Sequence, residues 1–188
     1  MDLLDFSDCT LYFEDPLPAE VEDLIAQAAH EYGGAGAETS LLRARRLAPE
    51  NLTVLVGLYR YYFYQHRLED AMQVAERAIY LSGRHLGLPA DWAELDEAWL
   101  AAAAATSFGL LRFYLLAHKA ASVVLLRLGR IPESRARLTK LASLDSRDQL
   151  GAMKLLDVVD EFQSPSEAAK DISAEAVSAE AVSELTVP

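Results

Sequence analysis

The chain has 188 residues, with 29 acidic and 17 basic side chains and a formal charge of −12. A hydrophobic fraction of 52% excludes a disordered chain, and the single cysteine excludes a secreted scaffold held by disulfides. The length predicts one domain that buries about 70% of the surface of its unfolded chain.

The excess negative charge lies at the two ends. Residues 1–24 hold eight acids and no base, residues 163–188 hold five acids and one base, and residues 25–162 hold 16 of each sign. An acidic chain without a basic run repels a phosphate backbone, so we expect no nucleic-acid partner.

Targeting and membrane signals are missing from the sequence. The N-terminus has acids where a secretory signal needs bases, and the longest uncharged stretch runs only over 98–111. A bilayer span needs about 20 residues, which is more than this stretch provides. The sequence therefore predicts a cytoplasmic protein that does not contact a membrane.

The first half of the chain predicts four helices. Apolar residues recur every three or four positions, and no sustained two-residue alternation indicates a strand. The predicted helices run over about 19–32, 37–48, 52–65 and 68–82. We expect Gly83 to end the fourth helix and 86–90 to form a connection.

The second half predicts three or four more helices. Asp91 can cap a fifth helix, on which Trp92 and Trp99 would share a face. Ser107 and its neighbours indicate a break before a helix that reaches residue 128, and the sequence leaves open whether 91–128 is one bent helix or two. Helices over 132–143 and about 147–162 follow, the last with a capping box at residues 146 and 149.

Composition divides the chain into three parts. Residues 1–18 are an acidic N-terminal segment, residues 19–162 form the helical domain, and residues 163–188 are a low-complexity acidic tail that we predict to be disordered.

A pattern of small residues recurs along the helical domain with constant spacing. The second predicted helix has Ala37, Leu41, Ala44 and Pro49, and the fourth has Ala71, Ala75, Ala78 and Gly83 at the same relative positions. A third set begins at Ser134, 63 residues after Ala71 where two further steps of the same size would give 68, so an irregular element near 84–106 interrupts the spacing. The pattern resembles the tetratricopeptide repeat (TPR) family, whose unit is a helix hairpin of about 34 residues. A helical bundle with coincidental spacing is the alternative.

The resemblance implies an all-α, right-handed superhelix of antiparallel helix hairpins with seven or eight helices. The first helix of each hairpin would line an inner groove that holds a segment of another protein. By this analogy Glu22 and His30 would contribute from the first helix. The partner-binding groove itself would be lined by Arg60, Phe63, Tyr64, Lys119, Val123, Leu126 and Arg127. This set does not match the carboxylate clamp with which some members bind heat-shock chaperones.

Five aromatic residues lie within positions 59–64, broken only by Arg60. They cover every side of a helix, so some belong to the core and others reach a surface. A helix buried on most sides and an aromatic wall on the groove both fit this run.

Catalytic chemistry is sparse in the sequence. The four histidines fall on different predicted helices or at their ends, Cys9 lies in an acidic segment, and no phosphate-binding glycine loop follows a strand. His118 fits either a polar patch on the groove or an interior histidine. We therefore predict no catalytic residue, no metal and no cofactor, and a protein that is not an enzyme.

Two functions fit these expectations. The first is an adaptor that binds a partner segment in the groove, and the second is a small bacterial assembly or secretion chaperone. Segments 58–64 and 110–115 resemble short bacterial TPR proteins associated with nitrogen fixation, which implies an accessory role in metalloenzyme maturation. Residues 110–147 hold eight bases and two acids, so we also hypothesise that an acidic end occupies the groove until a partner competes. The partner, the pathway and the oligomeric state, including a homo-oligomer, stay open.

Overall fold

The computed structural model describes residues 17–163, and that part holds seven α-helices, one short 3-10 helix and no strand. The all-α prediction is therefore confirmed for the described residues. The two acidic ends, 1–16 and 164–188, lie outside them, as does Cys9. The helices are α1 Ala19–His30, α2 Ala35–Leu47, α3 Leu52–Tyr64, α4 Leu68–His85, η1 Trp92–Glu94, α5 Glu97–Arg127, α6 Ile131–Leu144 and α7 Ala152–Gln163.

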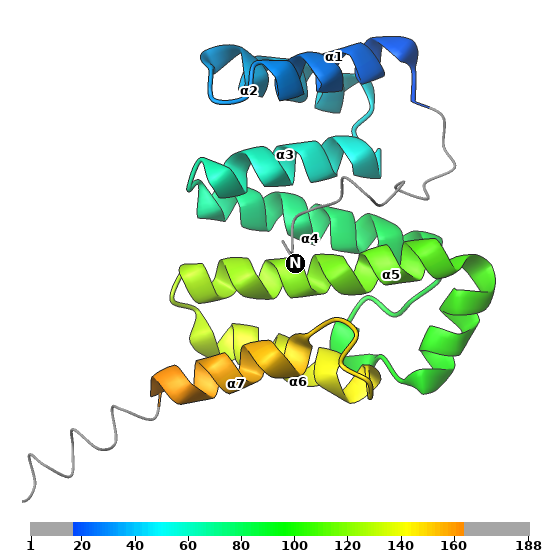
Figure 1. Ribbon diagram of the computed structural model, residues 1–188. Coiled ribbons are helices and arrows are strands. Elements are labelled where there is room, and N and C mark those ends of the chain that lie inside the picture. Colours follow the sequence, from blue (N-terminus) through cyan, green and yellow to red (C-terminus); the bar gives the residue numbers. More distant parts are fainter. Residues whose placement is uncertain (1–16, 164–188) are drawn as a thin grey trace, which may run out of the picture.

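Each α-helix packs on the next one in the sequence, so the helices form an elongated stack that begins with α1 and ends with α6 and α7 (Figure 1). Side chains of α3 contact α5 and the end of α1, whereas ion pairs join α2 to α4 and α4 to α6. Helices α1, α3 and α5 thus form one layer, and α2, α4 and α6 form the other, which we call the second layer. We call the surface of α1, α3 and α5 that faces away from α2 and α4 the inner face.

Nine residues of the repeated pattern lie in the core of the second layer. They occupy equivalent positions on α2, α4 and α6, and those that are Ala or Ser let neighbouring helices approach closely. Their exposed fractions do not exceed 5%: Ala37, Leu41, Ala44, Ala71, Ala75, Ala78, Ser134, Leu138 and Leu141. The hydroxyl of Ser134 donates to the carbonyl of Ser122 at 2.9 Å, which ties α6 to α5.

The prediction that Gly83 ends the fourth helix is wrong. Helix α4 continues to His85, and Gly87, at φ +67°, follows its end. Gly83 is buried, and a Cβ there would lie 3.0 Å from the ring of Tyr114. This glycine therefore serves the close approach of α4 and α5 rather than a turn.

The segment after α4 differs from the predicted fifth helix. Asp91 accepts a hydrogen bond from the backbone of Ala93 at 2.9 Å and caps only η1, whereas Asp96 caps α5 by accepting from Trp99 N at 2.9 Å. Trp92 and Trp99 consequently lie on different elements and share no helix face, which corrects the prediction.

The predicted break in the long helix is confirmed at Ser107. This residue has extended backbone angles, φ −160° and ψ 106°, and its hydroxyl accepts from Leu110 N at 3.3 Å. Helix α5 is therefore two helical segments joined at a kink, the second capped by Ser107.

The last helix begins five residues later than predicted. Asp148 and Gly151 adopt left-handed backbone angles, φ 47° and 68°, which do not fit a right-handed α-helix. Asp148 accepts from Met153 N at 2.9 Å, and so takes the capping role that the spacing of Ser146 and Gln149 had predicted for Ser146.

Among the described helices, α5 is long and apolar enough, by length and composition, to cross a membrane. Its second half belongs to the core of the stack, where Ala117, Ala121 and Val124 are buried. A core helix of a soluble protein passes the same test, so this feature is weak evidence for a membrane span.

Candidate functional site

A hollow of about 350 Å³ opens on the inner face between α1 and α3. Gly57 lets α3 approach α2 closely at the floor of the hollow, since a Cβ there would lie 3.1 Å from the Leu41 side chain. Its walls are apolar and aromatic apart from one charged side chain, that of Arg60. The lining residues are Ile25, Ala28, Ala29, Tyr32, Leu41, Gly57, Arg60, Tyr61 and Tyr64. We call this space the inner hollow.

A row of aromatic rings extends from the inner hollow along α3. Tyr32 and Tyr64 meet edge to face with their centroids 6.3 Å apart, Tyr64 meets Phe63 at 5.8 Å, and Phe63 stacks on Tyr59 at 5.8 Å. Tyr32 and Tyr64 are 51% and 41% exposed, so the row is open to solvent at the hollow. Its other end is the buried Tyr59.

Helix α5 reaches this row through Arg127. Its guanidinium lies over the Phe63 ring, 4.6 Å from the centroid, and its Nη2 lies 2.8 Å from His66 Nδ1. His66 lies in the turn between α3 and α4 with φ +58°, a backbone conformation that is uncommon for residues other than glycine. The hydroxyl of Tyr59 donates to the carbonyl of Ala120 at 3.4 Å, a second link between α3 and α5.

The charged side chains that act on two tyrosines of this row are arginines. Burial raises the pKa of Tyr59 and, less strongly, that of Tyr32, and the ions that oppose these shifts are Arg127 and Arg60, respectively. Among residues 17–163, no carboxylate is a cause of either pKa shift. Tyr62, between α2 and α4, differs because Glu38 adds to the rise of its pKa after burial.

Several arginines on or beside the second-layer helices pair with carboxylates. Arg67 binds Glu38 at 2.6 Å, and one Glu50 carboxylate binds two arginines of α4, Arg77 at 2.9 Å and Arg84 at 3.1 Å. Within the described residues neither Arg60 nor Arg127 pairs with a carboxylate. The inner face therefore carries two arginines without a carboxylate partner in residues 17–163.

Four of the predicted groove residues come together on the inner face: Arg60, Phe63, Tyr64 and Arg127. Val123 and Leu126 are half-buried on α5, one turn or less before Arg127, and neither lines the inner hollow. Glu22 and His30 are exposed on α1.

Lys119 is not part of the open groove, which corrects the prediction. It is 7% exposed, and its ammonium donates to the carbonyl of Leu150 in the segment before α7. Burial lowers its pKa, and nearby Lys154 adds to that effect while Asp148 opposes it. The chain itself covers this residue, because α6 and α7 fold back over α5 in a way that the helix spacing did not reveal.

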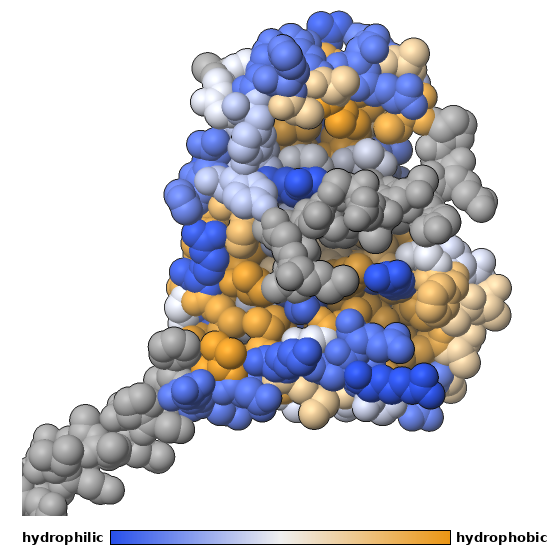
Figure 2. All heavy atoms as spheres, in the orientation of Figure 1, coloured by the Kyte–Doolittle hydropathy of each residue, from blue (hydrophilic) through white to orange (hydrophobic). Residues whose placement is uncertain are grey.

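The aromatic run divides between core and surface. Tyr59, Tyr61 and Tyr62 are buried, while Phe63 is half-buried and Tyr64 is exposed. Figure 2 views the stack in the orientation of Figure 1 and shows orange, hydrophobic patches over α5 and toward α7, with hydrophilic side chains between them.

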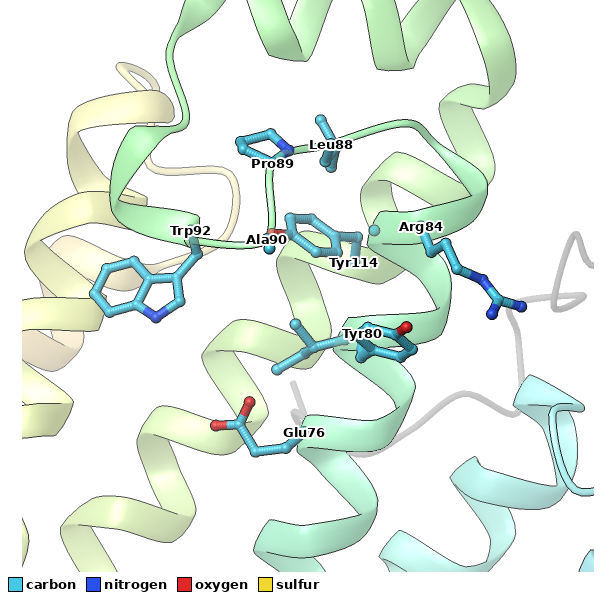
Figure 3. A pocket seen from close by; sticks show the side chains of 10 residues that line it. Glu76, Tyr80, Arg84, Leu88, Pro89, Ala90, Trp92 and Tyr114 are labelled. Atoms are coloured by element: carbon cyan, nitrogen blue, oxygen red, sulfur yellow. The ribbon is translucent and has the colours of Figure 1, made fainter.

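A second hollow, of about 440 Å³, lies between α4, α5 and the connection before η1. In Figure 3 residues 88–92 cross over it, Tyr114 stands at its centre, and Glu76 and Tyr80 approach it from α4. We call it the outer hollow. No sequence pattern indicated it, because the connection at 86–96 has no helical periodicity.

An ion pair between a buried arginine and a half-exposed glutamate supports the wall of the outer hollow. Arg137 of α6 is 8% exposed, and its Nη2 donates to Glu76 at 2.6 Å while its guanidinium lies 5.5 Å from the centroid of Trp92. The sequence reasoning missed this arginine. The signal was its position three residues after Ser134 and four before Leu141, on the buried stripe of α6.

His118 is an interior histidine and not a groove residue. It is 1% exposed, and its ring lies 4.6 Å from that of Tyr114 and 6.1 Å from that of Trp92. Burial, and secondarily the charge of Arg137, lowers its pKa to about 3, so the ring is neutral at pH 7.

Metal-binding side chains do not cluster in residues 17–163, where no group of three or more His, Cys, Asp or Glu could hold an ion. The site that the described chain offers is therefore an aromatic surface with two arginines.

A protein of Azotobacter chroococcum mcd 1 is similar to this chain. It is named "Uncharacterized 19.8 kDa protein in nifW 5'region", and it is 50% identical over 161 residues, which cover 86% of this chain and 90% of that protein. No family profile matches the chain. No solved structure matches it either.

Proposed function

This chain belongs to the family of the nifW-region protein of Azotobacter chroococcum, and we propose that it is a non-catalytic interaction module that serves nitrogen fixation. Its inner face binds a segment of another protein. The name of the relative supports the nitrogen-fixation context, because it places that protein beside nifW.

The proposed architecture is a TPR-like superhelix. Three features support it: the constant spacing of the small residues between α2 and α4, their burial on α2, α4 and α6, and the two-layer order of the helices. In such an array the first helices of the hairpins line a concave binding surface. Here these helices are α1, α3 and α5.

The observation that carries the proposal is the unneutralised charge among exposed rings. Arg60 and Arg127 pair with no described carboxylate, and Tyr32 and Tyr64 expose about half of their surface beside them. Tyrosine and arginine are enriched among the residues that dominate binding energy at protein interfaces. The inner hollow is also large enough to take a side chain of a partner.

Affinity co-purification from a nitrogen-fixing host tests the proposal. We expect the tagged chain to retain a nitrogen-fixation protein and the variant Arg60→Glu/Arg127→Glu to lose it. Arg45→Glu/Arg46→Glu is the matched control, because it makes the same charge change at two exposed residues of α2. Equal capture by both variants, at unchanged helicity by circular dichroism, would contradict the inner-face assignment.

A chaperone for metalloenzyme assembly is the second candidate. The apolar character of the inner hollow favours it, since an assembly chaperone covers apolar surface of an incomplete client. The two functions differ in the state of the partner. A chaperone keeps soluble a client that aggregates when expressed alone, whereas an adaptor binds a partner that is already folded, which calorimetry with the purified partner measures.

A further inference from the structure

The chemistry of the inner face defines the segment that fits it. Arg60 and Arg127 attract carboxylates, and the exposed rings of Tyr32 and Tyr64 accept aromatic or aliphatic side chains at the inner hollow. The matching ligand is therefore an acidic peptide segment that also carries apolar and aromatic residues.

Residues 1–16 of this chain have that composition. They contain five acids and no base, whereas residues 25–162 hold 16 of each sign. Six large apolar residues alternate in groups with the acids: Leu3, Leu4, Phe6, Leu11, Tyr12 and Phe13. The C-terminal segment 164–188 fits less well, because it has a base and no aromatic residue.

The position of the segment allows it to reach the inner hollow. The described chain begins at Leu17, which packs against the core, and α1 begins at Ala19. Tyr32, at the far side of the hollow, lies about 20 Å from Ala19 along the helix direction. An extended segment of this length spans at most about 50 Å, so its middle reaches the hollow without strain.

We propose that residues 1–16 are an intramolecular ligand of the inner face, with their carboxylates at Arg60 and Arg127 and an aromatic side chain in the inner hollow. This inference rests on the proposed function, because it assigns the chemistry of the partner that the same face binds. A partner of like composition displaces the segment. Occupancy of about 90% weakens the apparent affinity for such a partner about tenfold.

Cys9 provides a direct test, since it is the single cysteine of the chain and lies within the segment. The full-length protein is labelled at Cys9 with a benzophenone maleimide and irradiated, and the crosslinked peptides are mapped by mass spectrometry. We expect adducts within 25–32 and 57–64. They disappear in Arg60→Glu/Arg127→Glu and persist in Arg45→Glu/Arg46→Glu.

Three outcomes would overturn the inference: adducts at the outer hollow within 79–92, no adducts to the folded body, or adducts formed with a second copy. Irradiation of labelled chain mixed with ¹⁵N-enriched chain identifies the last case, because an intermolecular adduct then joins peptides of different isotopic mass.

A synthetic peptide of residues 1–16 gives a second readout. It binds the full-length variant Asp2→Asn/Asp5→Asn/Asp8→Asn about tenfold more tightly than the wild type, because the weakened internal segment leaves the face open. Equal affinity for both chains, or binding to neither, would overturn the inference. The proposed function fails separately, when the co-purified partner is retained despite Arg60→Glu/Arg127→Glu.

Discussion

Acid should destabilise the fold through one buried histidine. His118 is 1% exposed between Tyr114 and Trp92, and its pKa falls to about 3, first through burial and then through Arg137. In the unfolded chain a histidine has a pKa of about 6.5. Between these values the unfolded state binds a proton that the folded state excludes, so stability falls as the pH falls.

The size of this effect follows from proton linkage. Between pH 7 and pH 5 the folded His118 stays neutral while the unfolded histidine becomes protonated, which lowers the free energy of unfolding by about 2 kcal/mol. The loss continues toward the folded pKa of about 3. The destabilisation by His118 is absent only above the pKa of the unfolded histidine, so the free energy of unfolding rises between pH 5 and pH 7.

Urea unfolding at pH 7 and pH 5 measures this contribution. His118→Gln is expected to lower stability at pH 7 and to remove about 2 kcal/mol of the difference between the two pH values. His85→Gln, at an exposed residue near the end of α4, is the control and keeps the wild-type difference. If His118→Gln retained the wild-type pH dependence, the buried neutral state of His118 would be refuted.

Three further predictions concern the remaining structure. Glu76→Ala leaves the 8%-exposed Arg137 without its partner and should lower the free energy of unfolding by about 1–3 kcal/mol. The double variant Glu76→Ala/Arg137→Met should regain most of this loss. Equal losses in both variants, measured by urea unfolding, would argue against the pair. Ser107→Ala removes the cap of the second α5 segment and should lower the free energy of unfolding by about 0.5–1 kcal/mol, whereas Ser107→Asp should keep it near the wild-type value. Equal stability of the two variants by calorimetry would contradict the cap. Removal of residues 164–188 should leave the melting temperature unchanged, and a drop of several degrees would show that the tail docks.

The helices were largely predictable because their signals are local. Apolar periodicity and the break at Ser107 each depend on a few neighbouring residues, and the structure contains both. The errors come from residues whose role is set by another helix. Gly83 serves as a contact surface for Tyr114 of α5, which is distant in sequence, and no local pattern separates that role from a helix end.

The candidate site was likewise predictable only in part. Position within a repeat placed Arg60, Phe63 and Arg127 on one face, and the structure joins the last two by a 4.6 Å contact. The same reasoning failed for Lys119, because the turn at Asp148 and Gly151 directs the Leu150 carbonyl to its ammonium. Long-range closure of this kind depends on backbone geometry that composition and spacing do not encode.

The most direct test of the inner face as a binding surface compares two exposed tyrosines. Tyr64 borders the inner hollow and is 41% exposed, whereas Tyr80 borders the outer hollow and is 53% exposed. Each is replaced in turn by the photo-crosslinking residue p-benzoylphenylalanine, and cells growing on dinitrogen are irradiated. The account predicts an adduct with another protein from position 64 and none from position 80. Adducts from position 80 alone would contradict it.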